Sequence, residues 1–379
     1  MNYCKVIGLI ILVAFSVSFG TAAVGQLAGS DRKADRGKGE YDGANWMGQI
    51  KNRSVRLSRL SIPGTHDSGT KGISPLVFGL RCQNTTITRQ LTDGIRFFDI
   101  RLNDGNSFGK GVIDALSNPI SAAKTGFSKE SLFISHSLFS GGVTFGRVLK
   151  ECEEFLSKHE NEVILMSVKE EDCSGISPLF EEYLETYSEL FLFTDTIPTL
   201  EQAQGKIVLF YRFNFIPSEK NRHRLARTGI RLGSLVDNNI SYYKNRDGLF
   251  FYVEDFYRIH HTRDKITHVE ATLNKAASAE VPPNAGRTDT KRDNPPSSNM
   301  DIFYITFTSI ALNGMNTPYD YAWGGTLFKK KTDPAMNKWL KEYLLEGYGE
   351  RRLGVILMDF YNHRKDNELV RLIVEQQIE

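Results

Sequence analysis

Several short segments of this 379-residue chain place histidine, arginine, lysine or acidic side chains directly beside an apolar run. Histidine exchanges a proton near neutral pH, and arginine offers two parallel donors to a phosphate group. Bases, acids and cations gathered at one place suit phosphoryl chemistry, which depends on positioning and charge stabilisation. The candidate residues are His66, Asp67, Asp99, Arg101, His136, Lys169, Arg212, Asp255, Tyr257 and Asp359.

These side chains can meet only if the apolar runs form strands of one sheet. The runs are rich in β-branched and aromatic residues and apolar on both faces, which is typical of central strands in an α/β fold. They cover residues 59–62, 95–100, 132–135, 162–168, 206–213, 249–256, 301–309 and 353–361. Helical patterns over 144–159, 177–191 and 333–348 lie between several of them. The alternation predicts an α/β protein with a single, distorted TIM-type barrel, in which the C-terminal ends of the strands form one mouth.

The N-terminus has the features of a secretory signal peptide. A basic start, an apolar run over 6–20 and small residues near Ala23 follow one another. The alternative is a membrane anchor, but the run is shorter than the roughly 20 residues that a membrane span needs. We expect residues 1–23 to be a signal peptide and the protein to be secreted, either outside the cell or into the periplasm.

Two polar stretches divide the rest of the chain. Residues 24–43 are charged and glycine-rich, which predicts a flexible leader. Residues 277–299 contain proline pairs and no apolar period, which predicts a surface loop. Patterned sequence resumes directly after this loop, so we expect 44–379 to form one barrel domain.

Composition excludes nucleic acids as partners and does not decide whether the cysteines form a disulfide. The formal net charge of +2 is too small for a nucleic-acid-binding surface, so we expect no DNA or RNA partner. After removal of the signal peptide, Cys82, Cys152 and Cys173 remain, which is no disulfide framework. Either one bridge forms, with Cys152 and Cys173 the nearer pair, or all three are thiols.

Several motifs together resemble one known family. They are SIPGTHDSGT (61–70), GIRFFDIRL (94–102), EVILMSVKEE (162–171), GKIVLFYRF (205–213), FTS (307–309), NTPYDYA (316–322) and VILMDFYN (355–362). From about Trp46 to the C-terminus, the chain resembles the bacterial phosphatidylinositol-specific phospholipases C. The resemblance implies a distorted TIM barrel that cleaves phosphatidylinositol into diacylglycerol and inositol 1,2-cyclic phosphate. It also implies that neither a metal nor another cofactor is needed.

The resemblance assigns an acid and a base. His66 would take the proton from the inositol 2-hydroxyl, while Asp359 holds its imidazole. His136, oriented by Asp67, would protonate the departing diacylglycerol oxygen. An insert over 102–135 separates this histidine from the preceding motif, and we prefer it to His159, which falls within a predicted helix.

The same resemblance assigns the groups that bind substrate. Arg101, supported by Asp99, would neutralise the phosphate in the place where calcium-dependent relatives hold a metal. Lys169, Arg212 and Asp255 would bind inositol hydroxyls, and Tyr257 would stack on the ring. A membrane surface that contains phosphatidylinositol would be the partner, and we expect a monomer.

Residues near the mouth combine aromatic side chains with lysines, as interfacial binding requires. Phe78, Trp323 and Phe328 are the candidates for membrane contact, and ordinary core packing is the alternative. Two other functions stay open. One is a phosphodiesterase of the same fold acting on glycosylated phosphatidylinositol or another lipid headgroup. The other is a non-catalytic lipid-binding barrel.

Overall fold

The computed structural model describes residues 41–75, 77, 79–104, 131–137, 139–233, 238–259, 261–278, 298–311, 316–324, 334–347, 351–362 and 367–378. The predicted signal peptide, most of the leader, Phe78 and Phe328 lie outside these residues. The end of the predicted leader packs on the barrel, because the Tyr41 hydroxyl donates to the Asp93 carbonyl (2.9 Å). No helix in the described ranges is both long and apolar enough to cross a membrane.

The described strands belong to one twelve-stranded sheet with the order β6-β7-β5-β2-β1-β12-β11-β10-β9. Their bounds are β1 (Ile62–Thr65), β2 (Phe97–Asn103), β3 (Phe133–His136), β4 (Phe139–Thr144), β5 (Ile164–Glu170), β6 (Phe191–Leu192), β7 (Ile207–Tyr211), β8 (Ile230–Arg231), β9 (Asn239–Lys244), β10 (Phe250–Asp255), β11 (Ile302–Phe307) and β12 (Val355–Met358). From β6 to β10 every neighbouring pair is parallel, and β9 closes the series antiparallel to β10. β8 also pairs with β7.

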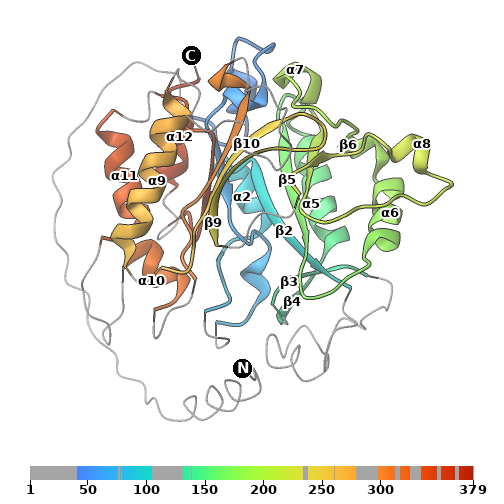
Figure 1. Ribbon diagram of the computed structural model, residues 1–379, viewed down its shortest axis with the longest axis horizontal. Coiled ribbons are helices and arrows are strands. Elements are labelled where there is room, and N and C mark those ends of the chain that lie inside the picture. Colours follow the sequence, from blue (N-terminus) through green and yellow to red (C-terminus); the bar gives the residue numbers. More distant parts are fainter. Residues whose placement is uncertain are drawn as a thin grey trace. The chain divides into compact units, whose positions relative to one another are not determined.

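The helices lie against the strands, as Figure 1 shows for α9, which lies beside β10 and β11. The α-helices are α2 (Ile87–Asp93), α5 (Phe145–Leu156), α6 (Ser177–Thr186), α7 (Leu200–Ala203), α8 (Arg222–Leu225), α9 (Thr262–Ala277), α10 (Pro318–Trp323), α11 (Met336–Leu345) and α12 (Glu368–Val374). Short 3-10 turns cover Met47–Gln49, Leu57–Arg59, Thr70–Gly72, Ser188–Leu190 and Asn299–Asp301. In α5, the Thr144 side chain caps the first turn and Phe145, Leu149 and Cys152 are buried along one face.

Aromatic contacts show that the sheet curls onto itself. Phe210 on β7 and Phe303 on β11 are far apart in the strand order, yet their ring centroids lie 5.2 Å apart. Side chains also join β9 to β8: the Tyr243 hydroxyl donates to the carbonyl of Leu232, which follows β8 (2.7 Å), and Nδ2 of Asn245, which follows β9, donates to the Arg231 carbonyl (2.9 Å). The chain is therefore a distorted TIM-type barrel.

Most of the predicted strands are present, but residues 132–135 were misassigned as a barrel strand. β3 runs antiparallel to β2 and forms a hairpin with β4. Only two residues separate β3 from β4, and such a short connection permits only an antiparallel pair. The predicted helix over 333–348 is also shorter, since α11 begins at Met336.

The structure describes both ends of the predicted loop and the state of three cysteines. α9 continues to Ala277 and a 3-10 turn starts at Asn299, so the ends of the predicted 277–299 loop are ordered, while 279–297 lie outside the described residues. Cys82, Cys152 and Cys173 are free thiols. The predicted domain bounds stay a prediction.

A buried ion pair fastens the start of the barrel. Arg96 Nε donates to Glu162 Oε2 (2.8 Å), both side chains are fully buried, and the remaining Arg96 donors bind backbone carbonyls, including that of Gly43 (2.9 Å). We predict that Glu162→Gln lowers the free energy of unfolding by about 3–5 kcal/mol, because the guanidinium is left buried without its counterion. Chemical denaturation measures this loss. The exposed neighbour Glu160 provides the control, since Glu160→Gln should change stability by less than about 0.5 kcal/mol.

Candidate active site

His66 is held at the mouth by the strand that precedes it. Gly64 lets β1 fit between its neighbours, since a Cβ there would lie only 2.7 Å from Leu357 Cδ2. Gln83 Nε2 donates to the backbone carbonyls of both His66 and Met358, at 2.8 Å each. The ends of β1 and β12 are thereby tied together, and the first residues beyond them are side by side.

The hydrogen bonds of His66 show which of its ring nitrogens carries the proton. Nδ1 lies 2.8 Å from Asp359 Oδ1, and Nε2 lies 2.8 Å from Arg101 Nη2. A carboxylate only accepts and a guanidinium only donates, so we assign the proton to Nδ1 and a lone pair to Nε2. Burial acts to lower the pKa of His66, but the carboxylates of Asp359 and Asp67 outweigh it and raise this pKa above its usual value. Nε2 is thus the atom able to accept a proton.

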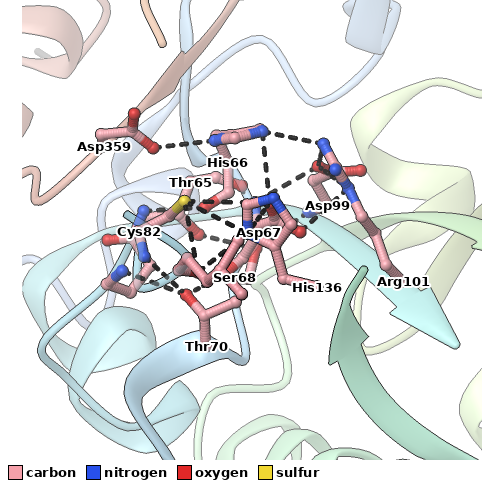
Figure 2. A network of polar contacts seen from close by, with 12 residues as sticks. Thr65, His66, Asp67, Ser68, Thr70, Cys82, Asp99, Arg101, His136 and Asp359 are labelled. Carbon is pink, nitrogen blue, oxygen red and sulfur yellow. Dashed lines mark hydrogen bonds and ion pairs between the residues drawn. The ribbon is translucent and has the colours of Figure 1, made fainter. Parts of the chain in front are cut away.

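His136 reaches the same site from the β3–β4 hairpin. Its Nδ1 lies 2.8 Å from the Leu80 carbonyl and 3.2 Å from Asp67 Oδ2. The two histidine rings are 6.5 Å apart between centroids and nearly perpendicular. Asp67 lies between them, with Oδ2 also 3.4 Å from His66 Nε2, as Figure 2 shows.

Two arginines and their carboxylates form the charged wall of the site. Arg101 Nε lies 2.9 Å from Asp67 Oδ1, and Arg101 Nη2 lies 3.2 Å from Asp99 Oδ2. Arg212 Nη1 donates to the other Asp99 oxygen (3.1 Å). Burial acts to raise the pKa of Asp99, but Arg101 and Arg212 hold it well below its usual range. The Asp99 carboxylate therefore stays charged between the two arginines.

The predicted headgroup-binding residues also lie at strand ends. Lys169 Nζ donates to Glu171 Oε2 (2.7 Å) beside β5, and Arg212 Nη2 lies 3.7 Å from Asp255 Oδ2 beside β10. Tyr257 follows Asp255 by two residues and is half-buried.

Sequence reasoning overlooked Glu171. Its Oε1 accepts from the Ser137 backbone N–H (3.2 Å) and lies 3.9 Å from Arg101 Nη1. Burial acts to raise the pKa of Glu171, but Arg101 and Lys169 lower it. A signal was present, because Lys169 and Glu171 are two residues apart at the end of a strand and so share a face.

The backbone turns sharply just after four of these side chains. Among the described non-glycine residues with left-handed φ angles are Asp67 (46°), Ser137 (53°), Asp172 (50°) and Phe360 (42°). They directly follow His66, His136, Glu171 and Asp359. Such conformations cost about 1–3 kcal/mol each and cluster at functional sites. Here each marks the point at which the chain leaves a strand end next to the mouth.

Trp323 is the described member of the predicted membrane-contact set. It is half-buried, and its Nε1 donates to the Phe360 carbonyl (2.6 Å). One turn earlier on α10, Tyr319 packs on Phe360 and is 37% exposed. Trp323 thus supports the segment that carries Asp359, and its contact with membranes stays a prediction.

Comparisons with known proteins agree with this geometry. Residues 60–213 match the family model described as phosphatidylinositol-specific phospholipase C, X domain. The 1-phosphatidylinositol phosphodiesterase of Staphylococcus aureus (strain Newman) is 27% identical over 333 residues, which cover 83% of this chain and 88% of that relative. The 1-phosphatidylinositol phosphodiesterase of Listeria monocytogenes is 25% identical over 371 residues, covering 93% and 92% of the two chains.

Solved structures show the same fold. A crystal structure of the phosphatidylinositol-specific phospholipase C of Staphylococcus aureus, with a pentafluoro-phenylalanine incorporated, superposes with a TM-score of 0.64 at 22% identity, covering 88% of this chain and 97% of that one. The enzyme from Listeria monocytogenes gives a TM-score of 0.59 at 20% identity, with 89% and 99% covered. Residues 60–213 thus match the X domain of phosphatidylinositol-specific phospholipase C, and most of the chain is similar to the bacterial enzymes of that name in sequence and in fold.

Proposed function

We propose that this chain is a secreted phospholipase C that cleaves phosphatidylinositol into diacylglycerol and inositol 1,2-cyclic phosphate. One observation carries the proposal. His66 bonds to the Arg101 guanidinium, Asp67 lies against both this guanidinium and His136, and each histidine has a carboxylate partner. An acid, a base and a fixed positive charge are what an in-line attack on a phosphodiester requires.

His66 is proposed as the general base. Its Nε2 lone pair takes the proton from the inositol 2-hydroxyl, and the oxygen attacks the neighbouring phosphorus. Asp359 at Nδ1 fixes the tautomer and stabilises the imidazolium that forms. In the free protein, Arg101 Nη2 donates a hydrogen bond to the lone pair of His66 Nε2 (2.8 Å). The incoming phosphate must therefore draw the guanidinium toward itself before His66 can accept a proton.

His136 is proposed as the general acid. With Asp67 at Nδ1, its protonated form presents Nε2–H to the diacylglycerol oxygen as the bond to phosphorus breaks. The nearly perpendicular arrangement of the two rings lets them act at different oxygens of one phosphorus. Slower hydrolysis of the cyclic phosphate would use the same histidines with their roles exchanged.

Arg101 is proposed to neutralise the phosphate, with Asp99 and Asp67 holding its guanidinium. This fixed cation removes the need for a metal ion in the reaction. Lys169, Arg212 and Asp255 are proposed to bind inositol hydroxyls with Tyr257 stacked on the ring, and Glu171 joins this group through Lys169.

Phosphorus NMR of the purified mature protein with phosphatidylinositol in detergent micelles and EDTA tests the proposal. A cyclic inositol phosphate resonance should appear first, and an inositol phosphate monoester later. Activity that disappears in EDTA and returns with calcium would contradict the role of Arg101. Release of a different headgroup would point to a related phosphodiesterase, and the absence of turnover with any lipid would favour a lipid-binding barrel.

The raised pKa of His66 predicts how activity depends on pH. A general base must be unprotonated, so kcat/KM should rise with pH through a pKa above the usual imidazole value of about 6.5. Asp359→Asn removes the strongest of the charges that raise this pKa, so the rise should move to lower pH. The maximal kcat/KM should fall roughly 10²- to 10⁴-fold, because the imidazolium loses its counterion. A rise that moves to higher pH would refute the pairing of His66 with Asp359.

A further inference from the structure

The site contains one reactive group that the proposed reaction does not use, the thiol of Cys82. Its Sγ lies 3.8 Å from Asp67 Oδ2 and 3.8 Å from His136 Nδ1, and the residue is fully buried. Figure 2 shows the sulfur directed at the group formed by Asp67 and His136. The backbone of Cys82 is fixed on both sides, because its N–H donates to Thr70 Oγ1 (3.0 Å) and its carbonyl accepts from the Phe360 N–H (2.9 Å).

The three side-chain atoms have the separations of metal ligands. Asp67 Oδ2 and His136 Nδ1 are 3.2 Å apart, and each is 3.8 Å from Cys82 Sγ. For a tetrahedral zinc ion with Zn–S of about 2.3 Å and Zn–N or Zn–O of about 2.0–2.1 Å, the sulfur edges would be about 3.6 Å and the remaining edge about 3.4 Å. Each observed separation agrees to within about 0.3 Å of these ideal edges.

We propose that Asp67, Cys82 and His136 form an inhibitory site for zinc or a similar thiophilic divalent cation. On binding, the thiol proton leaves to solvent. The proton on His136 Nδ1, which faces the Leu80 carbonyl and Asp67 in this structure, also leaves that atom, and the hydrogen bond to Leu80 is lost. The neutral imidazole then carries its one proton on Nε2 while Nδ1 coordinates the ion. A water molecule completes the tetrahedron. Thiolate and imidazole favour zinc over calcium or magnesium, which prefer oxygen ligands.

The charges around the site tolerate a cation. Carboxylates outnumber the positively charged side chains: Asp67, Asp99, Glu171, Asp255 and Asp359 face Arg101, Lys169 and Arg212. Arg101 Nε pairs with Asp67 Oδ1, at 2.9 Å, whereas the proposed ligand atom is Oδ2. The two cations would therefore share the Asp67 carboxylate without competing for the same oxygen.

Inhibition follows from the loss of the general acid, and this part rests on the proposed function. With zinc on Nδ1, His136 is held away from its pairing with Asp67 and cannot present a protonated, cationic ring to the leaving group. Zinc should therefore suppress phosphatidylinositol cleavage, and a chelator should restore it.

The test uses the mature protein without a histidine tag, beside Cys82→Ser and the control variants Cys152→Ser and Cys173→Ser. Cobalt(II) chloride is titrated first, because thiolate-to-cobalt charge transfer absorbs in the near ultraviolet whether or not the protein is active. The wild type and both controls should show this absorption with one cobalt per chain, and Cys82→Ser should lack it. Absence of the absorption in the wild type would overturn the site, even if Cys82→Ser does not fold.

Zinc chloride is then titrated against phosphatidylinositol cleavage, with each variant's rate expressed relative to its own zinc-free rate. Cys82→Ser should raise the half-inhibitory zinc concentration at least about tenfold, and the controls should leave it unchanged. Equal zinc sensitivity in all four proteins would overturn the inhibitory site. Cobalt binding at Cys82 without zinc inhibition would keep the metal site but overturn both its inhibitory effect and the assignment of His136 as general acid.

Discussion

Replacement of either histidine with alanine should lower the rate of phosphatidylinositol cleavage by at least about 10²- to 10⁴-fold. His66→Ala removes the Nε2 lone pair that faces Arg101, and His136→Ala removes the ring that Asp67 holds through Nδ1. Neither change leaves a group within reach that can exchange a proton near neutral pH in the same position. Initial rates followed by phosphorus NMR measure both losses.

A substrate with a better leaving group separates the two roles. If the diacylglycerol is replaced by a nitrophenol, the leaving oxygen needs no proton, so His136→Ala should recover most of its activity. His66→Ala should stay inactive, because the inositol hydroxyl must still be deprotonated. Recovery of His66→Ala instead would mean that the acid and base assignments are reversed.

His159 provides the matched control for both variants. Its Nδ1 lies 2.6 Å from Asn45 Oδ1 and its ring packs 4.5 Å from that of Phe155, outside the group of side chains at the mouth. His159→Ala should cleave phosphatidylinositol at the rate of the wild type. The structure also favours His136 over His159 as the second histidine of the site.

Much of the site could be predicted because it follows from the ends of parallel strands. His66 after β1, Arg101 near the end of β2, Lys169 in β5 and Asp359 after β12 meet wherever these strands lie side by side, and the apolar runs predicted that they do. No packing detail was needed for this inference. Their positions at the ends of strands were therefore sufficient to predict that these four side chains lie at one mouth of the barrel.

Three other residues, His136, Gln83 and Cys82, depend on features that sequence patterns do not reveal. His136 reaches the site from an antiparallel hairpin, and a four-residue apolar run does not indicate strand direction. Gln83 and Cys82 lie in a loop whose path depends on contacts with Thr70 and Phe360. Such loops follow from tertiary packing, so residues in them could not be placed beforehand.

The second large effect is expected at Arg101. Its guanidinium lies within 3.2 Å of both Asp67 and Asp99 and bonds to His66 Nε2, so a phosphate bound there would meet a fixed, planar cation. Arg101→Ala should reduce kcat/KM by about 10³- to 10⁵-fold, as for other arginines that stabilise phosphoryl-transfer transition states. Steady-state kinetics on phosphatidylinositol micelles measures the loss. The variant should also be less stable, because the buried carboxylates of Asp67 and Asp99 each lose one of their positively charged partners, and Asp99 keeps only Arg212.

Arg101→Lys distinguishes geometry from charge. Lysine keeps the positive charge but cannot offer two parallel donors, and its shorter reach cannot hold Asp67 and the phosphate together. We expect a loss of at least about 10²-fold in kcat with a smaller change in KM, because the missing contacts form mainly as charge develops in the transition state. Arg147→Lys is the control, since Arg147 pairs only with Glu151 on the surface among the described contacts. Wild-type kinetics for Arg101→Lys would mean that positive charge alone suffices. The proposal that two parallel donors of the Arg101 guanidinium bind the phosphate would then fail.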